Sequence, residues 1–375
     1  MPQLLPAAKP PRIVQKPGTA TKSELQSREA LLIVTPPSPA PGLWRSLPEG
    51  KQLKSLTKER KINDLAVTTR ISNKRNTAVT LASLPKAAHS EFERLSFAGK
   101  LARQALADQP SSLTLCLAGL DDQAGETVAK AIVAALLAAD FRLPDYKSKT
   151  GRRRGLKTIA VAGLSKRVDF NRVQAEAAGN NLARWLTALP PNELDAPAYI
   201  AAARDLSKQH GWRFEFLNET KLKKLGAGAF LAVSQGNATR DAGIVKLSYR
   251  PARQKAPDIA LVGKGIIFDT GGTNLKPFKA MLDMHYDMAG SAVALGTLVT
   301  ISTLQLPIAV DCWLAITENR LSNDAYKSRD IVTASNGTTI EIIHTDAEGR
   351  MALADTLALA GKAAPKAILD FATLT

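Results

Sequence analysis

The sequence has few cysteines, no long apolar segment and few acidic residues near its N-terminus, and each scarcity excludes a class of protein. Two cysteines occur in 375 residues, Cys116 and Cys312, and both lie in apolar, strand-like runs. They predict buried inert thiols rather than a disulfide framework or a thiolate metal site, and they suit a reducing compartment. No apolar run reaches the ~20 residues of a membrane-spanning helix, and no secretory pattern is present. We therefore expect a cytoplasmic protein without a membrane partner.

Acidic residues are scarce at the start of the chain, where no Asp or Glu precedes Glu24. Residues 1–80 carry fourteen Lys or Arg and five Asp or Glu, so nine of the sixteen net positive charges come from this region. Clustered basic residues neutralise phosphates, and nucleic-acid binding is one interpretation. No helix-turn-helix, zinc-finger or RNA-binding signature accompanies the charge. A solvated basic arm is the interpretation that we favour.

The length of the chain suggests about two domains with sizeable cores. Residues 1–20 are rich in Pro, Ala and Lys, and residues 1–28 predict a disordered basic arm. Strand-like and helix-like runs alternate over residues 29–165 and predict a small N-terminal α/β domain. Residues 166–375 predict a larger α/β domain, in which a mostly parallel central sheet is flanked by helices.

Within the larger domain, the expected strands cover residues 213–217, 243–249, 258–262, 307–316, 338–343 and 366–371. Helices are expected at about 170–189, 286–303 and 350–363. Another helix should begin after Asp195, which can cap it, with Pro197 in its first turn and Gly211 just past its end.

The most informative feature is a set of charged residues in otherwise apolar or Gly-rich segments. One group lies in residues 262–272 and just beyond, and the other lies in residues 343–350. In the second group Asp346 and Glu348 are two positions apart, so they point the same way if the backbone is extended. Taken singly, each charge would be a solvated lysine, a turn residue or a cap. Together they favour mutual neutralisation or a metal, because isolated buried charges are costly.

These segments resemble the leucyl aminopeptidase family of dinuclear-metal exopeptidases. Residues 345–350 (TDAEGR) match the core of the family signature, with His344 in place of the usual Asn. Residues 262–272 (VGKGIIFDTGG) are similar to a second family segment, with Thr270 for Ser. Residues 276–277 (KP), 287–290 (DMAG), 226–236 and 370–375 also match, in family order, and the likeness begins near Asn180.

The resemblance implies a site for two divalent metal ions, either zinc or manganese. By likeness, Asp269 and Glu348 bridge both metals, and Lys264 and Asp287 complete the tighter site. Asp346 completes the looser site through its side chain and its backbone carbonyl. A lysine ligand must be neutral, and two adjacent dications lower its pKa enough for that.

The resemblance also implies two catalytic residues. Lys276 would donate a hydrogen bond to the oxyanion of the tetrahedral intermediate, and Arg350 would hold a bicarbonate that acts as general base. An ion pair with a neighbouring carboxylate is the alternative for Arg350. Met284 resembles a residue that lines the pocket for the first substrate side chain, with core packing as its alternative. Thr373 and Leu374 resemble the strand end that binds the substrate backbone.

The implied function is an aminopeptidase that removes N-terminal, preferentially apolar, leucine-like residues from peptides through a water activated by two metals. Family members are hexamers, so a homo-oligomer is expected. The sequence stops at Thr375, at the end of an expected strand, and we expect the catalytic domain to be C-terminally incomplete. The alternatives are an inactive truncated pseudoenzyme and a DNA-binding architectural role of a basic aminopeptidase. The pattern G-x-x-x-x-G-K-[ST] is missing around Lys264, which argues against nucleotide hydrolysis.

Overall fold

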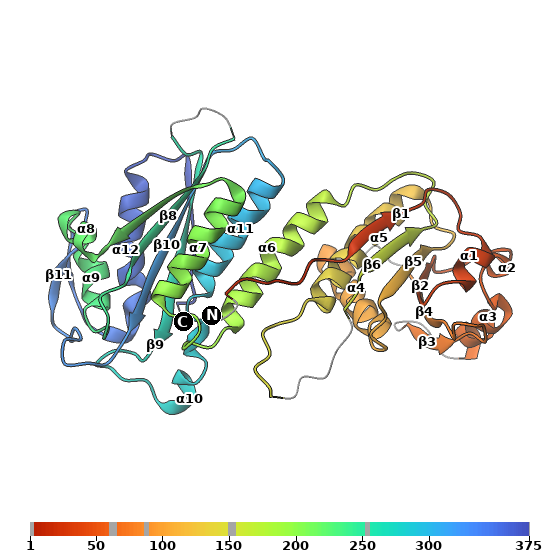
Figure 1. The fold of residues 1–375 in the computed structure, drawn as a ribbon, viewed down its shortest axis with the longest axis horizontal. Coiled ribbons are helices and arrows are strands. Elements are labelled where there is room, and N and C mark those ends of the chain that lie inside the picture. The colour runs from red at the N-terminus through yellow and green to blue at the C-terminus, as the bar shows by residue number, and fades with distance from the viewer. Residues whose placement is uncertain (1–3, 60–65, 86–89, 149–154, 252–255, 375) are drawn as a thin grey trace. The chain divides into compact units, whose positions relative to one another are not determined.

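The structure, a computed structural model, describes residues 4–59, 66–85, 90–148, 155–251 and 256–374. The chain forms two compact units, each with its own sheet and core (Figure 1). The N-terminal unit is Ala8–Ala177, and the C-terminal unit combines Met1–Ala7 with Ala178–Thr375. The division falls inside helix α6 (Asn171–Ala188), and not before it as expected from the boundary at 165/166.

The N-terminal unit is built on a six-stranded sheet in the order β1-β6-β5-β2-β4-β3, parallel except for the β3–β4 pair. Its strands are β1 (Arg12–Gln15), β2 (Ala30–Thr35), β3 (Val67–Arg70), β4 (Ala78–Ser83), β5 (Ser112–Leu117) and β6 (Thr158–Ala162). Its helices are α1 (Lys22–Gln26), α2 (Leu43–Ser46), α3 (Gly50–Glu59), α4 (Glu91–Ala105) and α5 (Asp122–Asp140). Two apolar clusters, one with α4 and α5 and one with α2 and α3, form the core.

The prediction of a disordered arm over residues 1–28 is wrong for the described part of that segment. Ile13 packs against the core, and β1 pairs in parallel with β6. Thr21 and Glu24 form a capping box that starts α1, and Leu25 of that helix is buried. A few apolar residues among the prolines and lysines are therefore enough to dock the segment, because the edge of β6 supplies the backbone partners.

The first described residues belong to the other unit. Leu4 and Leu5 pack against the core of the C-terminal unit. The indole Nε1 of Trp185, in α6, donates a hydrogen bond to the backbone carbonyl of Leu4 at 3.2 Å. The first described residues thus lie on the C-terminal unit, and the residues from Ala8 onward belong to the N-terminal one.

The C-terminal unit carries a five-stranded sheet in the order β13-β9-β10-β8-β7. Its strands are β7 (Arg213–Asn218), β8 (Gly243–Tyr249), β9 (Ile259–Asp269), β10 (Val310–Asn319) and β13 (Ala367–Phe371). The part β13-β9-β10 is parallel, and β8 and β7 continue it antiparallel. The expected strand at 338–343 lies instead in a separate hairpin of β11 (Ile331–Thr333) and β12 (Thr339–Glu341). The α/β class is confirmed.

Helices cover both faces of this sheet (Figure 1). Alternate residues of each strand face opposite layers: Val245 and Leu314 pack with α7 and α11, whereas Ile244 and Trp313 pack with α9 and α12. The helices are α7 (Ala196–His210), α8 (Glu219–Lys224), α9 (Gly228–Ser234), α10 (Phe278–Met281), α11 (Ala289–Thr303) and α12 (Glu348–Gly361), with 3-10 turns η1 (Met284–Tyr286) and η2 (Thr345–Ala347).

Two local predictions hold in detail. Asp195 caps α7, Pro197 lies in its first turn, and Gly211 ends it with a φ of 70°. Cys116 in β5 and Cys312 in β10 are buried and free, and burial raises the pKa of the Cys116 thiol to about 12. None of the described helices is both long enough and apolar enough to cross a membrane.

Candidate metal centre

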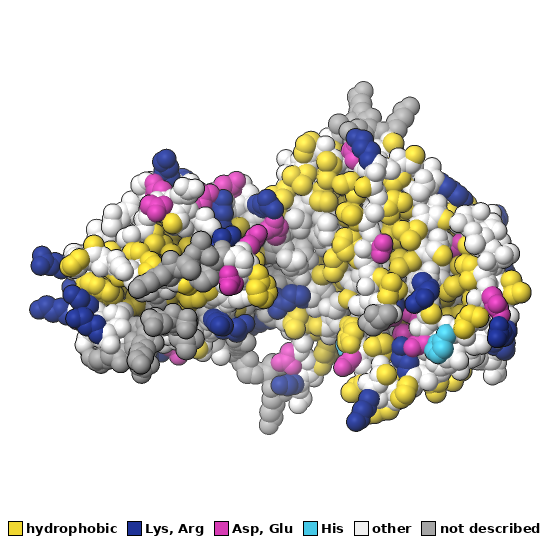
Figure 2. All heavy atoms as spheres, turned by 180° about the vertical axis from the view of Figure 1, so that it is seen from behind, with side chains coloured by type: hydrophobic (Ala, Val, Ile, Leu, Met, Phe, Trp, Pro, Cys, Tyr) yellow, Lys and Arg dark blue, Asp and Glu magenta, His cyan; other side chains and the backbone are white. Residues whose placement is uncertain are grey.

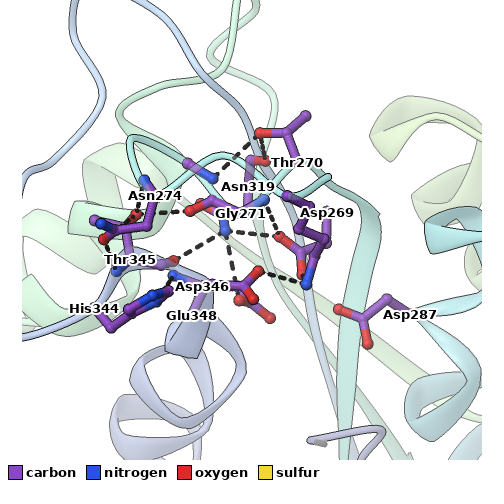
Figure 3. Close-up of polar contacts among 12 residues, drawn as sticks. Asp269, Thr270, Gly271, Asn274, Asp287, Asn319, His344, Thr345, Asp346 and Glu348 are labelled. Carbon is purple, nitrogen blue, oxygen red and sulfur yellow. Dashed lines mark hydrogen bonds and ion pairs between the residues drawn. The ribbon is translucent and has the colours of Figure 1, made fainter. Parts of the chain in front are cut away.

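A cluster of charged side chains lies where the parallel strands β9 and β10 end. Asp269 is the last residue of β9, and the loops that follow bring further charged residues to it (Figure 3). In open α/β sheets, ligands bind at the carboxyl ends of the parallel strands. The members of the cluster are Lys264, Asp269, Lys276, Asp287, Asp346 and Glu348.

Three carboxylates converge in the centre of this cluster. Asp269, Asp346 and Glu348 each offer an oxygen, and these oxygens lie within 4.8 Å of one another. Asp269 and Glu348 are buried, and Asp346 is partly exposed. The backbone there is not extended: Asp346 lies in η2 and Glu348 begins α12. The turn into the helix brings the two side chains together, not the strand periodicity from which the sequence argument started.

Lys264 lies beneath the first turn of α12 and is only 3% exposed. Its Nζ is 2.8 Å from Asp287 Oδ2 and 2.8 Å from Glu348 Oε1, and it donates a hydrogen bond of 2.7 Å to the Thr373 carbonyl. Gly349 makes this approach feasible, since a Cβ there would come within 2.6 Å of the Lys264 side chain. A solvated lysine is excluded.

Lys276 follows the tight turn after β9, where Gly271 has a φ of 86°. The backbone N–H of Lys276 donates to the Thr270 carbonyl at 2.9 Å and so fixes the loop. Its Nζ lies 3.0 Å from Asp269 Oδ2 and forms a second ion pair with Asp346. Lys276 therefore contacts two of the three convergent carboxylates, Asp269 and Asp346.

The electrostatics of the cluster show an excess of buried negative charge. Burial, and then the charge of Asp269, raises the pKa of Glu348 to about 7. Burial also raises the pKa of Asp287. Burial alone would lower the pKa of Lys276, but its bonds with Asp346 and Asp269 outweigh that effect and raise it. Four carboxylates thus face two ammonium groups.

This donor set fits divalent cations. Carboxylate oxygens bind zinc, manganese and magnesium. The formal charge of two lysines and four carboxylates is −2, which a dication would neutralise. An unpaired buried charge of that size is costly, so the arrangement suits a site that takes up positive charge from outside the chain.

The remaining residues from the sequence analysis lie around the cluster. Thr373 joins it, because its Oγ1 donates to Asp287 Oδ1 at 2.6 Å. Arg350, in the first turn of α12, is exposed and forms no ion pair with a described carboxylate. Met284 lies in η1, partly buried and outside the apolar cores of the described residues. Leu374 is 47% exposed.

Sequence analysis missed two polar residues of this region and noted a third, His344, only as a departure from the family signature. Asn319 ends β10 and Tyr326 follows it, and both are buried beside the carboxylates. His344 accepts a hydrogen bond from the Asp346 N–H through Nδ1 and caps η2. Asn319 had a readable signal: it is a polar residue at the carboxyl end of an apolar strand, as Asp269 is.

Comparisons with known proteins find similar sequences and a similar solved structure. The sequence model described as "Cytosol aminopeptidase family, catalytic domain" matches residues 181–375. A protein of Stutzerimonas stutzeri named "Probable cytosol aminopeptidase" is 46% identical over 61% of this chain and 47% of its own length. One of the same name from Pseudomonas fluorescens SBW25 is 39% identical over 68% and 52%.

A solved structure also matches. A mutant of tomato leucine aminopeptidase superposes with a TM-score of 0.83 and 25% identity, over 99% of this chain and 75% of that one. The chain spans about half the length of the curated relatives it matches.

Proposed function

This chain belongs to the cytosol aminopeptidase family, and from that premise we propose that it acts as a metal-dependent aminopeptidase that removes N-terminal residues from peptides. The observation that carries the proposal is the group of Asp269, Asp346 and Glu348, two of them buried, whose oxygens lie within 4.8 Å of one another. The names of the relatives also support a cytosolic location.

Two metal ions would be held by the residues that the sequence analysis assigned. Asp269, Asp346 and Glu348 would hold them with oxygens that lie within 4.8 Å of one another, and the family resemblance assigns Asp269 and Glu348 to both ions and Asp346 to one. Lys264 and Asp287 approach as a pair, 2.8 Å apart. When bound, the metals supply polarisation of the scissile carbonyl and a lowered pKa of the attacking water. Zinc and manganese both fit these ligands.

The residues of the chain itself would do the rest of the chemistry. Lys276 carries its ammonium group at the edge of the carboxylates, and its raised pKa keeps it charged, so it can donate to the developing oxyanion. Arg350 lies beside the N-terminus of α12, exposed and without a described carboxylate partner. A guanidinium there can hold an anion such as bicarbonate, which would take the proton of the water.

The substrate would lie over the exposed rim of the site. Leu275, Phe278 and Leu282, which are exposed by 54%, 75% and 60%, lie on the segment between Lys276 and Asp287 or beside it. They favour an apolar first residue, with Met284 lining its pocket, and Thr373 and Leu374 would bind the backbone. Figure 2 shows apolar side chains spread over much of one face of the C-terminal unit. Such surface marks interaction sites and supports a homo-oligomer.

The test is metal-linked peptidase activity. Purified protein should hydrolyse leucine p-nitroanilide with zinc or manganese, and elemental analysis should find up to two ions per chain. Asp269→Ala should remove both the bound metal and the activity. Substoichiometric metal at saturating concentration, with hydrolysis unaffected by Asp269→Ala, would contradict the proposal.

A further inference from the structure

Asn319 occupies the middle of the carboxylate cluster without being charged. Its side chain is fully buried, with 0% exposure. The amide Nδ2 donates at 2.8 Å to Asp269 Oδ1 and at 3.1 Å to the Thr345 carbonyl, and it lies 3.4 Å from Glu348 Oε2 (Figure 3). One amide nitrogen therefore contacts three of the segments that build the site.

The backbone aims this side chain. The register of β10 against β9 shifts between Thr317 and Asn319, so that Asn319 lies opposite Asp269. Irregularities of this kind re-aim a side chain at the end of a strand. The Asn319 carbonyl also accepts bonds from the Thr270 N–H at 2.9 Å and from Thr270 Oγ1 at 2.8 Å. Asn319 is thus fixed through both its backbone carbonyl and its side-chain amide.

The chemistry of the site requires an amide here. All three neighbours of Nδ2 are acceptors, so a flipped amide would place its oxygen against oxygens. An aspartate would add a fifth carboxylate to a cluster that already has an excess of negative charge. An aliphatic side chain would leave Asp269 and the Thr345 carbonyl without this donor.

Tyr326 acts on the same peptide group from the other side. Its hydroxyl donates to the Thr345 carbonyl at 2.7 Å, and the ring is 1% exposed. The Thr345 N–H donates to Asn274 Oδ1 at 2.8 Å, and Thr345 Oγ1 donates to the Gly271 carbonyl at 2.6 Å. Thr345 is therefore fixed through its carbonyl, its N–H and its side chain, and this fixes the peptide that precedes Asp346.

We propose that Asn319 and Tyr326 are positioning residues that hold Asp269, Asp346 and Glu348 in one arrangement suited to divalent cations. The inference rests on the proposed metal-dependent function. Neither residue is among the proposed metal ligands. Asn319 orients the Asp269 carboxylate directly, and both residues fix the Thr345 carbonyl and hence the turn that presents Asp346. Partners of this kind typically change metal affinity by about 10–100-fold when they are removed.

The experiment is a calorimetric titration of the full, metal-stripped chain with Co²⁺, followed in parallel by the visible absorption of the bound ion. Asn319→Ala should weaken Co²⁺ binding by about 10–100-fold and alter the absorption bands. Tyr326→Phe, which deletes a single hydroxyl, should weaken binding by about 3–10-fold. It is the safer variant should Asn319→Ala fail to fold.

The chain offers a matched control for each variant. Asn237 is a buried asparagine whose Nδ2 donates to Thr317 Oγ1 of β10 at 3.1 Å and forms no hydrogen bond with a described carboxylate. Tyr199 is a buried tyrosine whose hydroxyl bonds to Ser291 Oγ at 2.9 Å. Asn237→Ala and Tyr199→Phe should lower thermal stability and leave Co²⁺ affinity and absorption unchanged.

The outcomes separate the two claims. Weaker binding with altered bands in the site variants alone supports the positioning role. Wild-type affinity and bands in Tyr326→Phe, or in a folded Asn319→Ala, would overturn it, while the metal-dependent function would stand. A wild-type chain that binds no Co²⁺ would overturn the proposed function and this inference with it.

Discussion

The C-terminal unit buries carboxylates at both ends of its sheet, and the two ends differ in charge balance. At the start of β10, Asp311 is 1% exposed and meets two cations: Arg250 Nη2 at 2.7 Å and Lys246 Nζ at 3.2 Å. At the other end, four carboxylates meet Lys264 and Lys276. One cluster has more cations than anions, and the other has more anions than cations.

The difference separates a structural cluster from a binding site. Around Asp311, the cations extend partly into solvent, with about a fifth of each side chain exposed, so the surplus positive charge stays hydrated. Around Glu348, three of the four carboxylates are buried, and a proton or an added cation is needed to offset their surplus charge. A buried cluster of charged residues is thus a candidate metal site when its carboxylates outnumber its basic side chains.

Metal removal should give the largest loss of activity, and this loss should depend on the cluster around Glu348 and not on the cluster around Asp311. We expect exhaustive chelation to abolish hydrolysis of leucine p-nitroanilide, by about 10³-fold or more, because the metals polarise the carbonyl and activate the water. Zinc, manganese or cobalt should restore it. Asp311→Asn should behave like the wild type throughout this series. Activity that survives dialysis against a strong chelator would show that the cluster around Glu348 is not a catalytic metal site.

Replacing one lysine at each end should give the next largest difference. Lys276→Ala should lower kcat by about 10²–10³, the size expected for losing one oxyanion donor. Its metal content, from elemental analysis, should stay at the wild-type value. Lys246→Ala, which loses a partner of Asp311, should keep kcat. If Lys276→Ala also loses its metal, Lys276 belongs to the ligand set.

Neutralising Asp311 should destabilise the protein. Asp311→Asn leaves Arg250 and Lys246 without their anion, and we expect a loss of about 1–3 kcal/mol in the free energy of unfolding by urea. The solvent exposure of both cations keeps this below the cost of a fully buried pair. No loss of stability in Asp311→Asn would show that this cluster is not structural.

Neutralising Glu348 should stabilise the metal-free protein, and the size of this stabilisation should depend on pH. Its pKa of about 7 lies above the ordinary 4.5, so the folded protein holds the proton more tightly than the unfolded chain. The stability from this group is complete below pH 4.5 and is lost as pH rises through 7. In chelator, Glu348→Gln should therefore be more stable than the wild type at pH 8, by about 1–2 kcal/mol.

The difference between the two proteins should vanish near pH 4.5. Urea unfolding of both, at matched pH values, measures it. A wild type that gains stability relative to Glu348→Gln as pH rises would show that Glu348 is not held in an unfavourable charge environment.

Part of this structure could be read from the sequence. The long apolar strands and the capped helix after Asp195 follow from local patterns, and they match. The ligand candidates followed from a resemblance to a known family, and the structure brings them together. β1 and α1 could not be predicted, because their stability comes from the edge of β6 and from one buried leucine.

Tyr326 and the ion pairs of Lys276 could not be predicted from the sequence for a related reason. Tyr326 follows no pattern that marks it as buried, since it lies in a loop, and its partner is a backbone carbonyl. The ion pairs of Lys276 depend on the turn at Gly271, which a sequence does not place in space. The burial of Tyr326 and the ion pairs of Lys276 depend on tertiary contacts, which local sequence patterns do not predict.

The docking of Leu4 onto the C-terminal unit has a consequence for synthesis. Leu4 precedes Trp185, the donor to its carbonyl, by 181 residues. At about 5–20 residues per second, ribosomes take roughly 10–40 s to cover that interval. During that time Leu4 and Leu5 have no core to join, although the N-terminal unit can already fold around β1. Docking of Leu4 therefore has to wait at least until α6 has been synthesised.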